Sequence, residues 1–206
     1  NLRLGICKKY GTNFCELNLK DKDNIINFIR TNKPHYLIHN AAWVKDANKL
    51  DFNLNESLKV NIIPLRTLFE ELTRCSAKGI IITGTNAEYG DKNGSCSESD
   101  LCMPTTPYGL SKLSETITAY QLFNEFNLPT RVARVFNPIG GLDNPKKLLP
   151  SIISSVNINK SFKLSNCSQK RDFIYIGDLV NGYQKLIEEL KEGFEIFNLC
   201  SGFPLS

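Results

Sequence analysis

Tyr108 and Lys112 are the two residues of this chain whose types and spacing best fit proton transfer. They stand four residues apart behind Thr106 and Pro107, in a segment with the pattern of an amphipathic helix, so their side chains should share one helix face. Because a neighbouring ammonium group favours a phenolate, we expect Lys112 to lower the pKa of Tyr108 from about 10 towards neutrality. Such a tyrosine can donate or accept a proton at neutral pH, as carbonyl reduction and alcohol oxidation both require.

Two short segments that each follow a predicted strand could contact a ligand. Residues 39–42 (His-Asn-Ala-Ala) end in small side chains that would let a flat ligand approach the carboxyl edge of a sheet, although helix–strand packing explains them too. Residues 83–90 follow the next strand, and a threonine hydroxyl there would either bond a substrate carbonyl oxygen or cap the strand end. Trp43, directly after the first segment, is expected to pack rather than to stack on a ligand.

Two polar residues in the second half of the chain could bind a phosphate or a sugar. Asn137 could donate a hydrogen bond to either, and the guanidinium group of Arg171 could hold a pyrophosphate through its several N–H donors. For Arg171, an ion pair with Asp172 or Asp178 is an equally simple interpretation.

Alternating strands and helices are predicted from residue 12 to residue 200. The predicted helices cover residues 21–31, 55–74, 107–126, 147–157 and 178–191. The predicted strands cover residues 36–40, 79–83, 130–136, 162–165, 172–176 and 194–199, and residues 90–105 form a loop. Repeated strand–helix units indicate an α/β fold with a doubly wound parallel sheet. Residues 138–172, rich in Pro, Gly and Asn, interrupt the alternation, and we interpret them as a substrate-side insertion.

The composition excludes several classes of protein. A chain of 206 residues with 41% hydrophobic and 22% charged residues is typical of a soluble globular domain. Its net charge of +4 comes from scattered lysines without a basic run, so no nucleic acid partner is expected, and no apolar run is long enough for a membrane span. The 7 cysteines follow no regular framework and neither histidine has a CxxC companion, which favours free thiols in a reducing cytoplasm over a zinc site.

The order of these segments is far more specific than any one of them. In that order the chain resembles the extended short-chain dehydrogenase/reductases, the NAD-dependent epimerase/dehydratase family that modifies nucleotide sugars. The resemblance covers nearly the whole chain and rests on residues 39–42 (HNAA), Asn61 in KVN, and residues 84–90 (GTNAEYG), 107–112 (PYGLSK), 134–140 (RVFNPIG), 171–178 (RDFIYIGD) and 197–202 (FNLCSG).

The resemblance implies a Rossmann-like sheet that binds NAD or NADP together with a nucleoside-diphosphate sugar. Thr85, Tyr108 and Lys112 match the family's catalytic residues. The residues that match cofactor-binding positions are Asn18, Leu19, Asn40, Ala41, Ala42, Asn61, Tyr108 and Lys112. Those that match substrate-binding positions are Thr85, Asn86, Asn137 and Arg171, and no metal ligand is expected.

One departure from the family pattern is large. The family's glycine-rich turn after its first strand has no counterpart here, since Gly5 and Gly11 lack the strand–turn–helix context. With Asn1 at its start and Ser206 at its end, the chain is expected to be a fragment cut at both ends, without a strand that would lie beside the one near residue 37. We therefore expect residues 1–206 alone to bind cofactor poorly and to fold marginally.

We divide the fragment into two parts on this resemblance. Residues 1–137 would be a truncated NAD(P)-binding Rossmann-like domain. Residues 138–206 would be a mixed segment that combines substrate-binding elements with returning strands of the Rossmann sheet. The apolar face of the helix that starts at Pro107 fits either core packing or the paired-helix homodimer common in the family.

Asn86 and Ala87 discriminate among the reactions that the family catalyses. Dehydratases of the family carry an acidic residue within two positions of the catalytic threonine, and Glu88 is one position too far, so its side chain would face the other way in an extended segment. We therefore favour a 4-ketoreductase of a nucleoside-diphosphate 4-keto-deoxysugar, supported by the Cys96-x-Glu98 element downstream. A nucleotide-sugar 4-epimerase is the alternative; a 4,6-dehydratase and a non-catalytic scaffold are less favoured.

Overall fold

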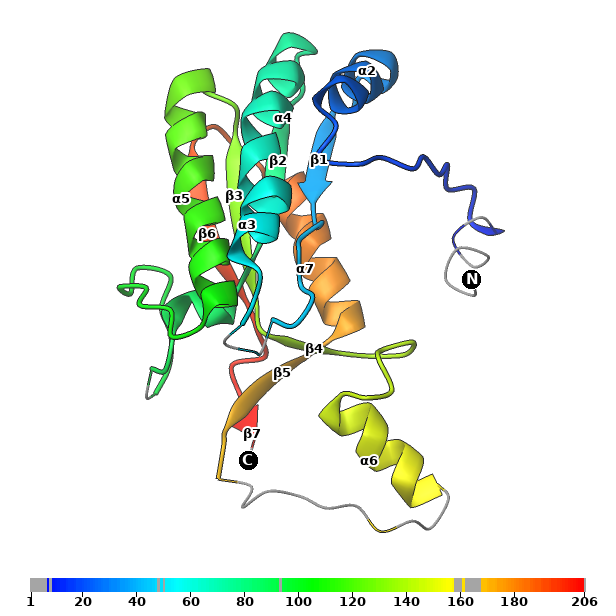
Figure 1. The fold of residues 1–206 in the computed structure, drawn as a ribbon, viewed down its shortest axis with the longest axis vertical. Coiled ribbons are helices and arrows are strands. Elements are labelled where there is room, and N and C mark those ends of the chain that lie inside the picture. The colour runs from blue at the N-terminus through cyan, green and yellow to red at the C-terminus, as the bar shows by residue number, and fades with distance from the viewer. Residues whose placement is uncertain are drawn as a thin grey trace.

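The computed structural model describes residues 7, 9–47, 49, 51–92, 94–157, 161 and 168–205. Its main sheet contains the four strands β1 (Tyr36–His39), β2 (Gly79–Thr85), β3 (Thr130–Val135) and β6 (Phe194–Leu199), in the order β1-β2-β3-β6 (Figure 1). All three neighbouring pairs are parallel. The predicted α/β fold with a parallel sheet is therefore confirmed, and β6 coincides with the predicted strand 194–199.

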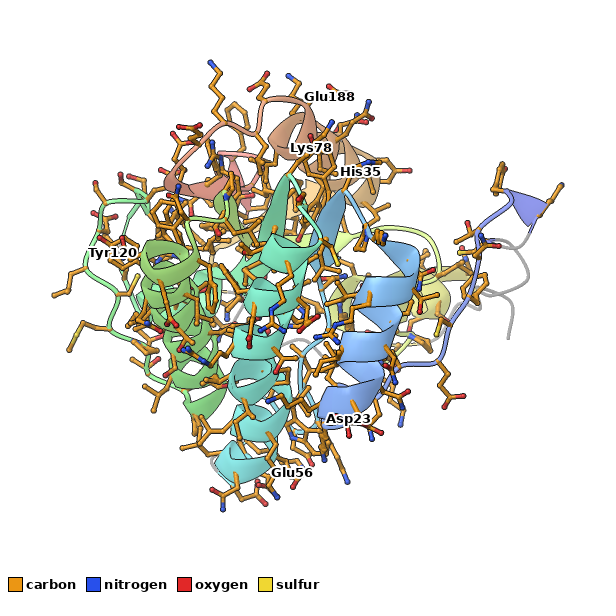
Figure 2. The ribbon with its side chains drawn as sticks, turned by 90° about the horizontal axis from the view of Figure 1, so that it is seen from above. Asp23, His35, Glu56, Lys78, Tyr120 and Glu188 are labelled. Carbon is orange, nitrogen blue, oxygen red and sulfur yellow. The ribbon has the colours of Figure 1, made fainter. Side chains whose placement is uncertain are left out.

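Helices cover both faces of this sheet. The helices α2 (Lys22–Asn32), α4 (Ile63–Arg74) and α5 (Pro107–Phe126) form a layer on one side, and α7 (Ile176–Glu188) lies on the other, as the view from above shows (Figure 2). Because side chains alternate along a strand, Ile80 and Ile82 of β2 pack beneath the layer of three helices, whereas Ile81 packs towards α7. β2 is thus buried on both faces, as its short apolar sequence at residues 79–83 predicted.

Capping residues set the helix ends close to their predicted positions. The Asp21 side chain accepts a hydrogen bond from the Asn24 N–H at 3.0 Å and starts α2. Thr106 does the same for α5 by accepting from the Gly109 N–H at 3.1 Å, with Pro107 as the first helical residue.

The predicted helix 55–74 is present but contains an irregular turn. It consists of α3 (Leu54–Ser57), a π-helical turn (Leu58–Ile62) and α4, which carries the buried residues Leu65, Phe69 and Leu72. Pro64 has no N–H to donate to the preceding turn, which interrupts the regular α-helical bonding at this point. The buried Asn61 lies within the π-helical turn.

A smaller sheet follows the main one in the second half of the chain. Its strands are β4 (Asn137–Ile139), β5 (Arg171–Tyr175) and β7 (Pro204–Leu205), with β4 and β5 parallel and β5 and β7 antiparallel. The helix α6 (Leu148–Asn157) lies in the chain between β4 and β5, close to its predicted position. The strand predicted at residues 162–165 lies outside the described residues.

The start of the predicted alternation is wrong, because residues 12–18 form no strand. A strand needs a hydrogen-bonding neighbour, and within the described sheet β1 pairs only with β2. Leu17 and Leu19 contribute to the fold differently, by packing against the core beneath the helical layer. The division of the chain at residue 137 stays a prediction.

Ile81 and Ile38 provide a matched test of this core, because they are partners in the β1–β2 register and differ in exposure, at 1% and 41%. Ile81→Ala should lower the free energy of unfolding by about 2–5 kcal/mol, because it leaves a cavity in the sheet, and Ile38→Ala by less than about 1 kcal/mol. Urea unfolding of both variants measures these values. Equal losses would contradict the described burial.

Candidate active site

The three predicted catalytic residues meet at the carboxyl end of β2. Thr85 is the last residue of β2 and the N-cap of a short 3₁₀ helix (Asn86–Tyr89), where its hydroxyl accepts from the Ala87 N–H at 3.3 Å. Tyr108 and Lys112 lie in the first turns of α5. The carboxyl edge of a parallel sheet is where α/β proteins bind ligands, so this convergence marks a candidate active site.

The Tyr108 phenol lies against Thr85 in a largely apolar setting. Phe52 packs edge-on against its ring with 6.2 Å between ring centroids. Burial raises the pKa of Tyr108, the Glu115 carboxylate raises it further, and a hydrogen bond with the Thr85 hydroxyl acts in the opposite direction. The expectation that Lys112 lowers the pKa of Tyr108 is therefore wrong, because the ammonium group pairs with Glu115 instead.

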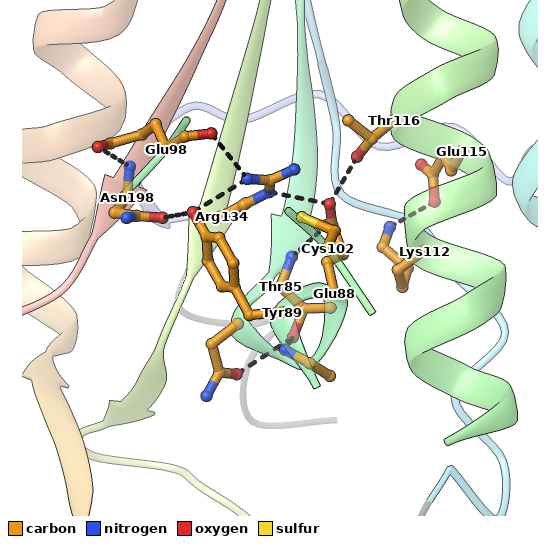
Figure 3. A network of polar contacts seen from close by, with 12 residues as sticks. Thr85, Glu88, Tyr89, Glu98, Cys102, Lys112, Glu115, Thr116, Arg134 and Asn198 are labelled. Atoms are coloured by element: carbon orange, nitrogen blue, oxygen red, sulfur yellow. Dashed lines mark hydrogen bonds and ion pairs between the residues drawn. The ribbon is translucent and has the colours of Figure 1, made fainter. Parts of the chain in front are cut away.

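Lys112, Glu115 and His39 form a buried cluster behind Tyr108. Their exposures are 3%, 0% and 5%, and the Glu115 carboxylate forms an ion pair with the Lys112 ammonium group (Figure 3). His39 Nε2 lies 3.6 Å from Glu115 Oε1. Burial raises the pKa of Glu115 to about 7, while burial and the Lys112 charge lower the pKa of His39 to about 4.

Sequence reasoning assigned no chemistry to Glu115 and used His39 only as part of a strand end. The available signal was the position of Glu115 three residues after Lys112, which places both side chains on one helix face. His39 ends β1, whose neighbour β2 is packed against α5. The sequence did not show that this helix face is the buried one.

Asn61 joins the loop after β1 to α5. Its side-chain oxygen accepts from the Trp43 N–H at 2.8 Å, and its side-chain nitrogen donates to Ser111 Oγ at 3.0 Å. This bond pattern holds the predicted cofactor-binding residues Asn40, Ala41 and Ala42 beside the start of α5. Asn40 and Ala41 are exposed and Ala42 is half-buried.

Glu88 joins the threonine loop to two other elements. Its carboxylate, which is 0% exposed, accepts from the Thr85 N–H at 2.8 Å, from Thr116 Oγ1 at 3.0 Å and from Arg134 Nε at 2.9 Å (Figure 3). These donors belong to the end of β2, to α5 and to β3. Glu88 therefore fixes the position of Thr85 relative to Tyr108 and is fully occupied in doing so.

The same network reaches the loop at residues 90–105. Arg134 Nη1 donates to the Tyr89 hydroxyl at 2.9 Å, which in turn donates to Asn198 Oδ1 at 2.7 Å. Asn198 closes the network by donating from its N–H to Glu98 Oε1 at 2.8 Å and from Nδ2 to the Cys96 carbonyl at 3.1 Å. The Cys96-x-Glu98 element thus has a structural role in attaching this loop to β6.

The predicted substrate residues Asn137 and Arg171 lie in the smaller sheet, apart from the catalytic group. Asn137 Nδ2 donates to the Asp172 carbonyl at 2.8 Å, and the Asp172 carboxylate accepts from the Ser201 and Gly202 N–H groups, each at 2.8 Å. Arg171 is exposed at the start of β5, and no ion pair to it is found within the described part of the chain. Their proposed contacts with substrate stay predictions.

The predicted cofactor-binding residues Asn18 and Leu19 lie in the turn that precedes α2. Asn18 is exposed and its side-chain oxygen accepts from the Lys20 N–H at 3.0 Å, whereas Leu19 packs against the core. Lys20 lies over the Trp43 ring, 5.8 Å from its centroid, so this segment contacts the loop after β1.

The donor set at the carboxyl edge fits the nicotinamide-ribose end of a dinucleotide. A phenol and an ammonium group lie one helical turn apart beside the small residues 41–42, and Trp43 Nε1 is a buried donor that has no partner within the described residues. Nothing in this sequence supplies the glycine-rich turn for the pyrophosphate. Among the described residues no group of acidic, histidine or cysteine side chains could hold a metal ion, and no helix is both long and apolar enough to cross a bilayer.

The chain belongs to the NAD dependent epimerase/dehydratase family, whose model matches residues 3–200. Members of this family include NAD-dependent epimerases, dehydratases and reductases of nucleotide sugars. The resemblance found in the motifs is thereby confirmed.

Two curated relatives and one solved structure illustrate this range. The dTDP-D-glucose 4,6-dehydratase of Dictyostelium discoideum is 24% identical over 217 residues, which cover 98% of this chain and 49% of that protein. The dTDP-4-dehydro-6-deoxyglucose reductase of Escherichia coli is 28% identical over 184 residues, which cover 86% of this chain and 54% of that protein. The chain thus spans about half the length of these relatives.

The solved structure supports the fold. UDP-glucuronic acid 4-epimerase from Bacillus cereus, in complex with UDP-glucuronic acid and NAD, matches with a TM-score of 0.85 at 24% identity. The match covers 100% of this chain and 66% of that one.

Removing the Glu88 carboxylate should test its role in holding the site together. Glu88→Ala leaves the guanidinium of Arg134 buried without its partner, so the free energy of unfolding should fall by about 3–5 kcal/mol. Glu125→Ala, which breaks the exposed ion pair with Arg66, should cost less than about 1 kcal/mol. Denaturant unfolding measures both, and a loss at Glu88 no larger than that at Glu125 would contradict the assigned role.

The contributions of Glu115 and His39 to the free energy of unfolding should depend on pH in opposite directions. Between about pH 4.5 and 7 the folded state binds the extra proton at Glu115, so its contribution to stability is lost as the pH rises through about 7. Between about pH 6.5 and 4 the unfolded state binds the extra proton at His39, so that contribution is lost as the pH falls through about 4. The two contributions therefore have opposite slopes.

Single variants should expose these slopes. Relative to wild type, the stability of Glu115→Gln should rise with pH between about 4.5 and 7, and that of His39→Gln should fall with pH between about 4 and 6.5, each by the order of 3 kcal/mol. Urea unfolding over this pH range measures the slopes and is insensitive to a constant loss of stability. Slopes of the same sign would refute the assigned protonation states.

Proposed function

We propose that the protein containing this chain is an NAD(P)-dependent nucleotide-sugar oxidoreductase, specifically a 4-ketoreductase acting on a nucleoside-diphosphate 4-keto-deoxysugar. The observation that carries the proposal is the placement of the Tyr108 phenol beside Thr85 at the carboxyl end of β2, close enough for the threonine side chain to affect the pKa of the phenol. The buried ammonium group of Lys112 lies one turn further along α5.

These residues can protonate a carbonyl oxygen as it is reduced. When bound, NAD(P)H supplies the hydride for C4 of the sugar. Tyr108 would donate its proton to the C4 oxygen, and its raised pKa keeps the phenol protonated at neutral pH, as a proton donor must be. Thr85 would hold the same oxygen and stabilise its developing negative charge, while Lys112 would bind the cofactor ribose.

Dehydration is disfavoured by what stands next to Thr85. Elimination of water needs additional acid and base groups, and the half-buried Asn86 and Ala87 supply neither. Glu88, the nearest carboxylate in sequence, is fully buried and accepts hydrogen bonds from three protein donors. The relatives include dehydratases, but these neighbours of Thr85 favour a different reaction for this chain.

The family and one relative named for reduction of a related ketone support the proposed substrate class. The Escherichia coli relative is named for reduction of dTDP-4-dehydro-6-deoxyglucose, a nucleoside-diphosphate 4-keto-deoxysugar. Arg171 and Asn137, both near the start of their strands in the smaller sheet, are proposed to contact the diphosphate and the sugar. A second candidate is 4-epimerisation, since the same phenol and hydroxyl can act in both directions and a UDP-glucose 4-epimerase is among the relatives.

A homodimer is also proposed, through the outer face of α5. Leu110, Ile117 and Tyr120 are exposed by 46%, 59% and 52% on this helix, so its apolar residues are not all used by the core. Such a face fits helix-to-helix association between two copies.

Tyr108→Phe tests the proposed function, with Tyr120→Phe on the exposed face of the same helix as the matched control. Losing the general acid should reduce turnover by about 10²–10⁴-fold while binding of NADH or NADPH persists, and the control should retain full turnover. The assay follows the absorbance of NAD(P)H in the full-length protein with a panel of nucleoside-diphosphate 4-keto-6-deoxysugars.

The outcomes separate the candidates. Oxidation of NAD(P)H by a 4-keto-sugar supports the reductase. Interconversion of UDP-glucose and UDP-galactose without consumption of NAD(P)H supports the epimerase instead. Cofactor binding without turnover on either panel supports a non-catalytic relative, and full turnover in Tyr108→Phe contradicts the assigned acid.

A further inference from the structure

A buried carboxyl group stands between Lys112 and His39, where the catalytic residues themselves require none. Glu115 is 0% exposed and one of its oxygens pairs with the Lys112 ammonium group. Its other oxygen, Oε1, has no hydrogen-bond partner among the described residues, and neither has His39 Nε2, although the two atoms face each other at 3.6 Å. α5 contributes the carboxyl group and β1 contributes the imidazole.

Glu115 Oε1 and His39 Nε2 are both buried, have no partner among the described residues and face each other. This arrangement indicates that the two groups can share a proton. A buried polar atom without a partner is destabilising, so a hydrogen atom shared between Glu115 Oε1 and His39 Nε2 would stabilise both groups. A protonated Glu115 can donate to Nε2 when the neutral imidazole of His39 carries its proton on Nδ1. An ionised Glu115 can accept from Nε2–H when the imidazole carries its proton on Nε2 instead. A small approach of the two atoms from 3.6 Å would therefore give the carboxyl group a hydrogen-bond partner in either protonation state.

We propose that Glu115 is a positioning residue for Lys112: backed by His39, its ionised carboxylate holds the ammonium group, and its protonation releases the ammonium group to the cofactor ribose. This inference rests on the proposed function, because it assigns the ribose as the second partner of Lys112. Lys112 is itself only 3% exposed. Its ammonium group can therefore pair with Glu115 or with a bound ribose, but not with bulk solvent.

The groups around Glu115 place its protonation in the working pH range. Lys112 faces it from the same helix and His39 faces it from β1. The Glu88 carboxylate acts on it from the 3₁₀ helix after β2, and the Tyr108 phenol is the group that Glu115 in turn affects. Burial and Glu88 favour the neutral carboxyl group and Lys112 favours the ionised one, which leaves the pKa at about 7.

Binding of the cofactor to Lys112 should therefore be accompanied by uptake of a proton at Glu115. When ribose hydroxyls take over the ammonium group, the Glu115 carboxylate loses the charge that kept it ionised, so it takes up a proton from solvent. The proton comes to rest on Glu115 and is shared with His39 Nε2. Cofactor binding near neutral pH should then be accompanied by proton uptake and should weaken as the pH rises.

The first test uses the free protein and needs no cofactor. In the full-length protein, the imidazole signal that is absent from the spectrum of His39→Gln is assigned to His39. In long-range ¹H–¹⁵N spectra, His39 Nε2 should show an inflection near pH 7 from the titration of Glu115, and the inflection should vanish in Glu115→Gln. A flat response in wild type, or an inflection that survives in Glu115→Gln, overturns the proposal.

The second test measures proton uptake when NADH or NADPH binds to the full-length protein. Calorimetric titrations at about pH 7 in buffers of different ionisation enthalpy should give a fractional proton taken up per cofactor in wild type and none in Glu115→Gln. Glu125→Gln, which changes an exposed glutamate of the same helix, is the control and should behave as wild type. Zero uptake in wild type, or equal uptake in Glu115→Gln, overturns the proposal.

Two further experiments distinguish failure of this inference from failure of the proposed function. If Glu115→Gln does not fold, His39→Gln replaces it, since removing the imidazole should reduce the uptake, and unchanged uptake in that variant contradicts the proposal. If neither NADH nor NADPH binds to wild type, the proposed function fails, and the histidine spectra alone decide whether Glu115 and His39 share a proton.

Discussion

The Glu88 carboxylate is the interaction on which the geometry of the site depends. It is completely buried, and three elements donate to it: the backbone at the end of β2, a threonine of α5 and an arginine of β3. A buried charge is tolerated only when it is paired and its remaining lone pairs are satisfied, and Glu88 meets both conditions. Because one carboxylate accepts all three bonds, the loop that contains Thr85 and the helix α5 are both fixed to the sheet.

The N-terminal part of the buried face of α5 is polar, whereas Ala119 and Leu122 further along belong to the hydrophobic core. Tyr108, Ser111, Lys112, Glu115 and Thr116 occupy its inward side near the carboxyl edge of the sheet, while Leu110, Ile117 and Tyr120 remain exposed. A core of this kind is stable only if each polar group finds a partner. Ser111 accepts a hydrogen bond from Asn61, Thr116 donates one to Glu88, and Lys112 forms an ion pair with Glu115. The packing of this helix and its proposed chemistry therefore depend on the same contacts.

The fold was largely predictable from the sequence, because strands buried on both faces and capped helices have strong local patterns. The strand Phe194–Leu199 and the helix Pro107–Phe126 coincide with their predictions. The segment at residues 12–18 failed for a non-local reason, since an extended segment becomes a strand only beside a neighbour. The order of the motifs predicted that Thr85, Tyr108 and Lys112 act together, and their catalytic roles stay a prediction.

The electrostatics of that group were not predictable, since spacing along a helix does not reveal which partner a charged group prefers. The four-residue spacing of Tyr108 and Lys112 was correct, yet the ammonium group pairs with the carboxylate one turn further on. As long as that pair holds, the phenol keeps a raised pKa and remains a proton reservoir. Transfer of the ammonium group from Glu115 to a ribose would also remove the negative charge that raises the pKa of Tyr108. The phenol would then become a stronger acid only once the hydride donor is in place, and Glu115 would link cofactor binding to the strength of the catalytic acid.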